Sequence, residues 1–147
     1  MSSPDALDPV GRARLEAVFE DALEQPEIVR TLESAEELHA FADAFNWDDA
    51  SVRALVEVIR HPLCDAGTAK LIYWRADPDD LFVEYASRDD VDSEVRREHW
   101  DLLIEIEDRL AEEAFATSRI PFEPPYERAE GKAQGRPIPA ALFEPTR

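Results

Sequence analysis

The chain has 147 residues, a length that fits one domain with a sizeable hydrophobic core. Acidic residues outnumber basic ones by 34 to 16, so the formal net charge is −18. This charge argues against nucleic acid and anionic membranes as partners, because both attract basic surfaces. The single cysteine excludes an intrachain disulfide framework. No apolar run is long enough for a signal peptide or a membrane span, so we expect a cytoplasmic protein.

Helix start signals organise the first part of the chain. Asp8-Pro9 predicts a helix whose apolar face is formed by Leu15, Val18, Phe19 and Ala22. A second, short helix is expected over residues 26–32. The segment Ser34-Ala-Glu-Glu37 matches a capping box, in which each of the two side chains accepts from the other residue's backbone N–H. The helix that follows should bury Leu38, Phe41 and Phe45, and we expect His39 to be half exposed beside them.

Two segments of equal length come next, residues 49–62 and 65–78. Each combines an aspartate that can cap a helix, about three helical turns and a final proline. Their similarity suggests consecutive helices stacked as in HEAT-like or variant leucine-rich-repeat arrays. A buried strand is the alternative for residues 70–74, which read Lys-Leu-Ile-Tyr-Trp. We favour a helix there, since Asp65 and Pro78 frame the segment and no partner strand is visible.

The last predicted helices cover residues 78–86 and 92–115. The longer one should turn inward the side chains of Val95, His99, Leu102, Leu103, Ile106 and Leu110. Asp92–Arg96 and Glu105–Arg109 have the i, i+4 spacing of helical ion pairs. Residues 116–147 differ in character, because they hold six of the eleven prolines and carry five basic against four acidic residues.

These patterns predict an all-α fold of six or seven helices, stacked in part as a short HEAT-like array of variant repeats. Residues 1–115 form the predicted helical domain. Residues 116–147 should form an extended, Pro-rich C-terminal strap that is packed on the helices through its apolar side chains or is partly disordered.

Two motifs carry a resemblance to a known family. Asn-Trp-Asp-Asp-Ala (46–50) precedes His-Pro-Leu-Cys-Asp-Ala-Gly-Thr-Ala (61–69), and Tyr73-Trp74 follows. They resemble the bacterial domain of unknown function family 4274, whose pattern is similar to Asn-Trp-Asp-Asp-Gly, a helix and Pro-x-Cys-Asp-x-Gly-Thr-Ala. The resemblance covers about residues 35–86, and Ala50 stands where the pattern has glycine. Because the family has no settled activity, the resemblance implies a helical domain and little chemistry.

Few residues suggest catalysis or metal binding. Asp48 and Asp49 suit helix N-caps better than a shared acid–base or metal site, since adjacent residues do not share a helix face. His61 and Cys64 have ligand-type chemistry, but a zinc site would need two further ligands. Cys64 fits a buried thiol, and Trp47 fits a core anchor whose indole N–H donates to a carbonyl. We therefore expect no cofactor and no metal.

The leading functional hypothesis is a non-enzymatic interaction module that offers acidic side chains to a basic protein. An immunity-type inhibitor of a toxin is one form of it, by analogy with other small acidic helical proteins. The predicted contact residues are Asp48, Asp49, Glu57, Asp77, Asp79 and Asp80.

Two other hypotheses stay open. The first is a small-molecule-binding or hydrolytic enzyme domain with a pocket around Trp47, His61, Cys64, Asp65 and Trp74. Convergence of these residues in a concave, partly polar pocket would favour it, and burial of the tryptophans with aspartates acting as caps would count against it. The second is self-association through the apolar C-terminal segment. The oligomeric state cannot be read from the sequence.

Overall fold

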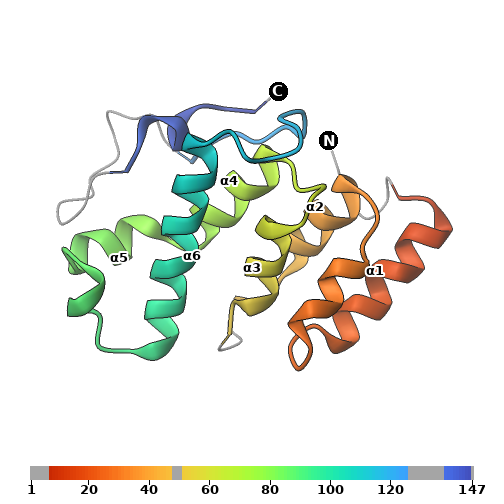
Figure 1. The fold of residues 1–147 in the computed structure, drawn as a ribbon, viewed down its shortest axis with the longest axis horizontal. Coiled ribbons are helices and arrows are strands. Elements are labelled where there is room, and N and C mark those ends of the chain that lie inside the picture. Colours follow the sequence, from red (N-terminus) through yellow and green to blue (C-terminus); the bar gives the residue numbers. More distant parts are fainter. Residues whose placement is uncertain (1–6, 48–50, 126–137, 147) are drawn as a thin grey trace.

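A computed structural model describes residues 7–47, 51–125 and 138–146, and these residues fold as helices and connecting segments (Figure 1). The all-α prediction is confirmed, and residues 66–75 form a helix rather than the alternative strand. No described helix has the length and apolar character needed to cross a membrane. The α-helices are α1 (Pro9–Asp21), α2 (Ala35–Ala44), α3 (Arg53–Arg60), α4 (Ala66–Arg75), α5 (Pro78–Glu84) and α6 (Glu94–Ala111). The short 3-10 helices are η2 (Pro26–Thr31), η3 (Arg88–Asp90) and η5 (Ala140–Phe143).

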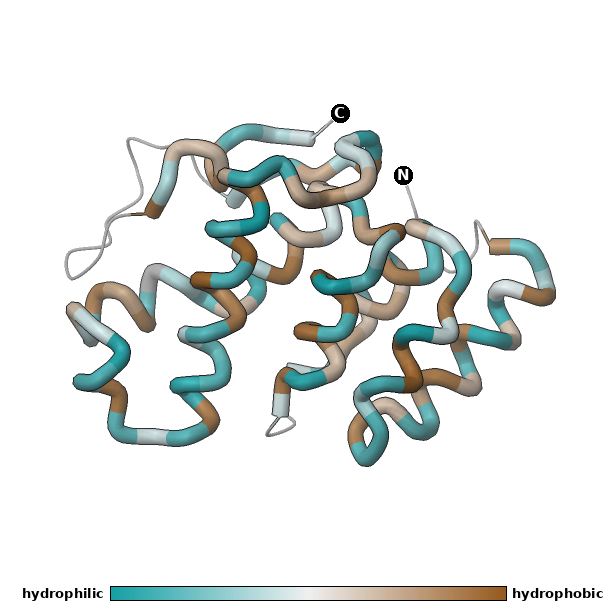
Figure 2. Tube along the Cα trace, in the orientation of Figure 1, coloured by the Kyte–Doolittle hydropathy of each residue, from teal (hydrophilic) through white to brown (hydrophobic). Residues whose placement is uncertain are grey.

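The helices pack in two facing rows. One row runs α1, α2, α4, and the other runs η2, α3, α6, with each helix in contact with its neighbours in the row. The pairs α1–η2, α2–α3 and α4–α6 join the rows, and α5 packs on α4 and α6 at the far end (Figure 1). Apolar and hydrophilic residues alternate along the helical trace (Figure 2), as expected for helices that bury one side. The core therefore lies between the two rows.

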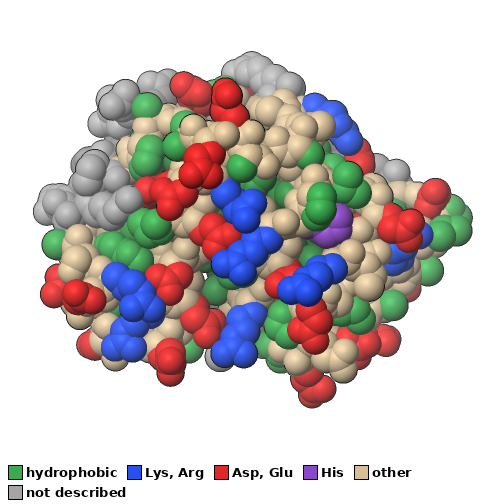
Figure 3. Space-filling model, in the orientation of Figure 1, with side chains coloured by type: hydrophobic (Ala, Val, Ile, Leu, Met, Phe, Trp, Pro, Cys, Tyr) green, Lys and Arg blue, Asp and Glu red, His purple; other side chains and the backbone are tan. Residues whose placement is uncertain are grey.

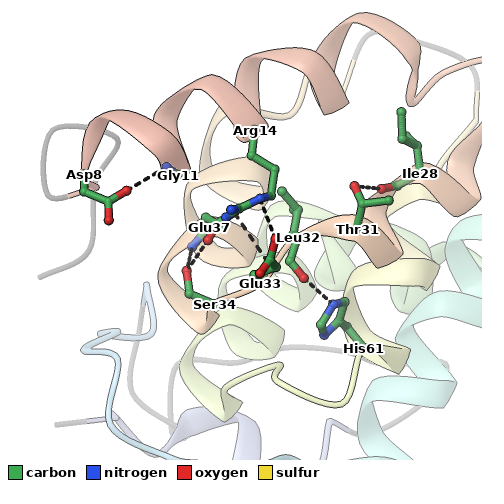
Figure 4. Close-up of polar contacts among 10 residues, drawn as sticks. All are labelled: Asp8, Gly11, Arg14, Ile28, Thr31, Leu32, Glu33, Ser34, Glu37 and His61. Carbon is green, nitrogen blue, oxygen red and sulfur yellow. Dashed lines mark hydrogen bonds and ion pairs between the residues drawn. The ribbon is translucent and has the colours of Figure 1, made fainter.

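Three of the predicted helix starts, at Asp8, Ser34 and Asp65, are confirmed. Asp8 accepts a hydrogen bond from the Gly11 N–H at 2.7 Å and caps α1. Ser34 caps α2 by accepting from the Glu37 N–H at 3.1 Å, and its hydroxyl donates to the Glu37 carboxylate at 2.8 Å (Figure 4). That carboxylate also accepts from Arg14 of α1 at 2.8 Å. Glu37 accepts from the Glu33 N–H at 3.5 Å and from the Ser34 hydroxyl rather than from the Ser34 N–H that a capping box predicts. Its carboxylate thus fastens α1 to α2 beside the cap of α2.

Two predictions in this region are wrong. His39 is only 7% exposed rather than half exposed, because α2 lies between α1 and α4. Its Nδ1 lies 2.9 Å from the hydroxyl of Thr68 on α4. The aspartate cap predicted for the first of the two similar segments is also absent, since α3 begins after Val52, which makes no side-chain cap. Asp48 and Asp49 themselves lie outside the described residues.

Helix α6 matches its prediction in the middle and differs from it near its start. Leu102, Leu103 and Ile106 are buried, but Val95, in the first turn, is 37% exposed. The ion pair Glu105–Arg109 forms at 3.1 Å as predicted. The Arg96 guanidinium instead lies beside Asp80 and Glu84 of α5, at 3.3 and 3.0 Å, which links the two helices.

The described part of the C-terminal segment lies across the ends of α4 and α6 (Figure 1). Its residues Ile120 and Leu142 are almost completely buried. Trp74 and Lys70, one helical turn apart on α4, donate hydrogen bonds to the carbonyls of Leu142 and Glu144 at 2.7 and 2.9 Å. Side chains of one helix therefore hold backbone groups about seventy residues further along the chain.

Candidate functional site

Asp65 is the centre of the motif that the sequence singled out. Its carboxylate is completely buried and accepts four hydrogen bonds. Oδ1 accepts from the N–H groups of Gly67 at 2.7 Å and Ile120 at 3.1 Å. Oδ2 accepts from the Thr117 hydroxyl at 2.5 Å and the Arg119 N–H at 2.8 Å. One carboxylate thus caps α4 and holds the turn at residues 117–120.

The charge of Asp65 is balanced by these donors rather than by a cation. Burial alone raises the pKa of the carboxyl, whereas the hydrogen bonds from Arg119, Thr117, Gly67 and Ile120 favour its charged form. Their combined effect lowers the pKa below its usual value. The carboxylate is therefore ionised and fully occupied, which leaves it unsuited to act as a general base.

Two neighbouring motif residues serve the same junction. A Cβ atom on Gly67 would lie 2.0 Å from the carbonyl oxygen of Ile120, so only glycine allows this close approach. The Ala66 N–H donates to the Thr117 carbonyl at 2.8 Å, and the Ala116 N–H donates to the Cys64 carbonyl at 3.1 Å. The motif at 64–67 is thus a docking point for residues 116–120.

Cys64 is buried, as predicted. Desolvation is the main cause of a strong rise in the pKa of its thiol, and the charge of Asp65 adds to it. Because the thiolate is the nucleophilic form, this thiol is unreactive at neutral pH.

His61 lines a groove of about 600 Å³ together with Arg30, Glu57 and Leu63. The other four predicted pocket residues do not line this groove. Its Nδ1 accepts from the Leu63 N–H at 3.1 Å, and this contact assigns the ring proton to Nε2. Nε2 then donates to the Leu32 carbonyl at 2.9 Å (Figure 4). Both ring nitrogens are therefore engaged by the backbone in this arrangement.

The two tryptophans lie at separate places in the fold. Trp74 is buried against the C-terminal segment. Trp47 is half buried after α2, and its indole N–H has no acceptor among the described residues, so the predicted bond to a carbonyl is not formed there. Its ring instead packs nearly perpendicular to the rings of Phe45 and His99, at centroid distances of 5.4 and 6.0 Å. The predicted pocket residues thus do not form one pocket, and no group of three metal-ligand-type side chains occurs in the described parts of the chain.

The predicted partner-binding acids have varied surroundings. Asp48, Asp49 and the side chain of Asp79 lie outside what the structure describes. Glu57 accepts two hydrogen bonds from Arg30 at 2.5 and 3.0 Å, and Asp80 lies 3.3 Å from Arg96. Asp77 occupies the N-cap position of α5 with a left-handed backbone (φ 61°). Glu57 and Asp80 therefore already share their charge with an arginine.

A different group of acids is unpaired. Over residues 16–27 the chain has five acidic residues and no basic one, all five exposed. Within the described residues, none of the five forms an ion pair with lysine, arginine or histidine. We call this set the α1 acidic edge: Glu16, Glu20, Asp21, Glu24 and Glu27. The run is visible in the sequence, and the fold adds that no cation of the described residues forms an ion pair with it, although the charge of Glu27 still acts on Arg30.

A groove of about 240 Å³ has a mixed lining of apolar and polar residues, and four of them, Phe19, Ala22, Leu23 and Pro26, are interspersed in the sequence with the acids of the α1 acidic edge. The ring of Phe19 stacks on that of Phe41 with centroids 4.8 Å apart, and Phe41 approaches Phe45 at 6.2 Å. Leu23 is 58% exposed beside these rings. Figure 3 shows acidic and hydrophobic side chains close together over the end of the molecule that contains α1. The end of α1 and the residues that follow it thus carry exposed apolar and negatively charged side chains close together.

Residues 33–111, more than half of the chain, match the family model of a domain of unknown function, DUF4274. The chain belongs to this family. No curated protein and no solved structure matches it.

Proposed function

We propose that this DUF4274 protein is a non-enzymatic interaction module that binds a basic protein through its acidic surface. An inhibitor of the immunity type, which covers the basic cleft of a toxin, is the specific form that we favour. The single observation that carries the proposal is the α1 acidic edge, five exposed carboxylates without a paired cation among the described residues. Such a surface accelerates association with a basic partner and loses strength as salt rises.

The state of the chemically versatile residues supports the proposal. The carboxylate of Asp65 and both ring nitrogens of His61 are engaged in hydrogen bonds, and the Cys64 thiol is buried. A catalytic site needs groups that are free to touch a substrate. These three residues contribute instead to the docking of distant segments.

The position of the charges gives further support. The acids Glu20 and Asp21 lie in the last turn of α1, which contains no basic residue. The helix dipole places partial negative charge at this end, so acidic side chains there destabilise the free helix. A lysine or arginine from a partner would relieve this repulsion, which gives a basic partner more to gain at α1 than at Glu57 or Asp80.

The test is capture of proteins from the native cell lysate by the tagged full chain, in low and high salt. We expect a basic protein to be retained at low salt and released at high salt. An unrelated acidic protein of the same net charge is the control bait, because any polyanion collects some basic proteins. Retention of the same proteins by both baits, or of none by either, would refute the proposal.

A further inference from the structure

We infer that the groove between α1, η2, α2 and α3 binds an amphipathic, basic helix of the partner, with apolar side chains in the groove and lysine or arginine against the α1 acidic edge. This inference rests on the proposed function and names the surface and the chemistry of the partner. The apolar part of its lining includes Phe19, Leu23, Pro26, Phe41 and Phe45, and Asn46 and Ser51 add polar groups.

The size of the groove favours side-chain anchors over a small-molecule ligand. Its volume of about 240 Å³ lies below the roughly 300–1,000 Å³ of small-molecule pockets. It has room for one or two large apolar side chains. Helix-in-groove recognition uses such anchors at i, i+3 or i+4 spacing, because these positions share one face of the bound helix.

The lining explains why an apolar anchor would gain from entering. Phe19 is 37% exposed and Leu23 is 58% exposed, so both still present apolar surface to water. Phe41 is buried and stacks on Phe19, so the groove has an aromatic floor. Burial of apolar surface against a preformed floor is favourable without ordering a flexible loop.

The charges around the groove select a basic occupant. Glu24 follows Leu23 directly and Glu20 precedes it by three residues, and residues 16–27 contain no basic residue to balance these charges. A second copy of this chain would bring a net charge of −18 and the same acidic edge to the groove. Like charges placed together oppose binding, so a positively charged helix is the occupant that fits.

The test uses a fluorescent model peptide of leucine and lysine at helical spacing, about fourteen residues or four turns long. Its binding to the full chain is followed by anisotropy at low and high salt. Leu23→Ser should weaken binding about tenfold, the loss expected when an apolar anchor contact disappears. Glu20→Gln combined with Glu24→Gln should weaken binding at low salt at least threefold and flatten the salt dependence.

Matched controls separate this groove from general attraction to an acidic protein. Asp108→Asn combined with Glu112→Gln removes the same charge from exposed positions at the C-terminal end of α6. Leu63→Ser changes an exposed leucine in a different groove. Both controls should bind the peptide within twofold of the natural chain. Neutralising Glu20 and Glu24 should also raise the melting temperature by about 2 °C, since it removes repulsion at the end of α1.

Equal losses of peptide affinity in the test and control variants would overturn the inference. It would also be overturned if sedimentation showed that the natural chain is a dimer that blocks peptide binding and that Leu23→Ser converts it to a monomer. The same variants serve as baits for lysate capture. A basic protein retained equally by all of them would leave the proposed function standing and refute the groove. If peptide binding depends on Leu23 but no basic protein is captured from the lysate, the proposed function is refuted, and the preference of the groove for a basic amphipathic helix is established.

Discussion

Asp65→Asn tests whether the motif at residues 64–67 is a structural junction. The substitution keeps the shape of the side chain and replaces one acceptor oxygen with an NH₂ group. If the remaining oxygen stays with Gly67 and Ile120, the new amide faces the Thr117 hydroxyl and the Arg119 N–H. The hydroxyl can rotate to accept a hydrogen bond, but the N–H cannot. The Arg119 N–H, a part-buried donor beside the buried carboxylate, is then left without an acceptor.

The size of the effect follows from these contacts. A donor that loses its acceptor in this junction lowers the free energy of unfolding by about 1–3 kcal/mol. The surviving hydrogen bonds also weaken, because the acceptor is no longer charged. We expect the two effects together to cost about 3 kcal/mol. For a chain of this length, about 3 kcal/mol lowers the melting temperature by about 9 °C. Urea unfolding followed by circular dichroism should give the same loss in the free energy of unfolding.

Asp8→Asn is the matched control, because Asp8 also caps a helix through a 2.7 Å hydrogen bond but is exposed. Asparagine and aspartate are equally good N-caps, so this variant should stay within about 0.5 kcal/mol of the natural chain. If Asp65→Asn costs no more than Asp8→Asn, the reasoning about the buried junction is refuted.

The pH dependence of the same variant gives a second readout. The pKa of Asp65 is lowered in the folded chain, so its contribution is complete above the unfolded carboxyl pKa of about 3.9. It is lost as the pH falls through the folded pKa, because protonation then costs the native state its charged acceptor. The stability difference between the natural chain and Asp65→Asn should therefore be large at neutral pH and shrink below about pH 4. A difference that stays constant down to acid unfolding would contradict the assigned role.

Three further predictions concern the core. Gly67→Ala forces a Cβ atom against the Ile120 carbonyl and should lower the free energy of unfolding by about 2–3 kcal/mol in thermal unfolding, with faster hydrogen exchange at Ile120. Gly11→Ala is the control, because the nearest contact of its Cβ atom would be a side-chain oxygen at 3.2 Å, and it should stay within about 1 kcal/mol. The Cys64 thiol should resist a thiol reagent in the native state and react once the chain is unfolded, and rapid native labelling would contradict its raised pKa. Burial lowers the pKa of His39, so its neutral form stabilises the fold at neutral pH. This contribution should decline as the pH falls below the usual histidine pKa of about 6.5. A proton NMR titration should place the midpoint of the His39 titration below that value.

The helix starts could be predicted because their signals are local. Asp8, Ser34 and Asp65 each cap a helix within three residues of themselves, so the pattern and its structural effect lie in the same stretch. The burial of His39 could not be predicted in this way. It depends on α1 and α4 packing on both sides of α2, and nothing in the local pattern reports that arrangement.

The candidate site was harder to predict for the same reason. The sequence indicates that Asp65 caps α4, but three of its four hydrogen bonds come from residues more than fifty positions away. The acids of the α1 acidic edge stand together in the sequence with Phe19 and Leu23, yet only the fold shows that these two apolar residues line a groove whose other wall comes from α2 and α3. Long-range contacts determine both the hydrogen bonds of Asp65 and the groove beside α1. Helical periodicity and capping residues report only local structure, so they do not predict such contacts.

Only part of the groove lies within the residues that match the family model, and this suggests which residues determine partner specificity. Residues 33–111 match the family model, so α2 and α3 with Phe41 and Phe45 belong to the shared domain. The α1 acidic edge and Leu23 lie before residue 33. The motif at residues 64–67 is occupied in docking residues 116–120, so it cannot also discriminate between partners. On the proposed function, the shared helices provide the aromatic floor, and the preceding helix α1 chooses the partner through its charge. Neutralising the five acids of residues 16–27 to Gln or Asn, with the buried Val18 and Ala22 and the groove residues kept, should therefore abolish capture of the basic partner while the full chain still folds.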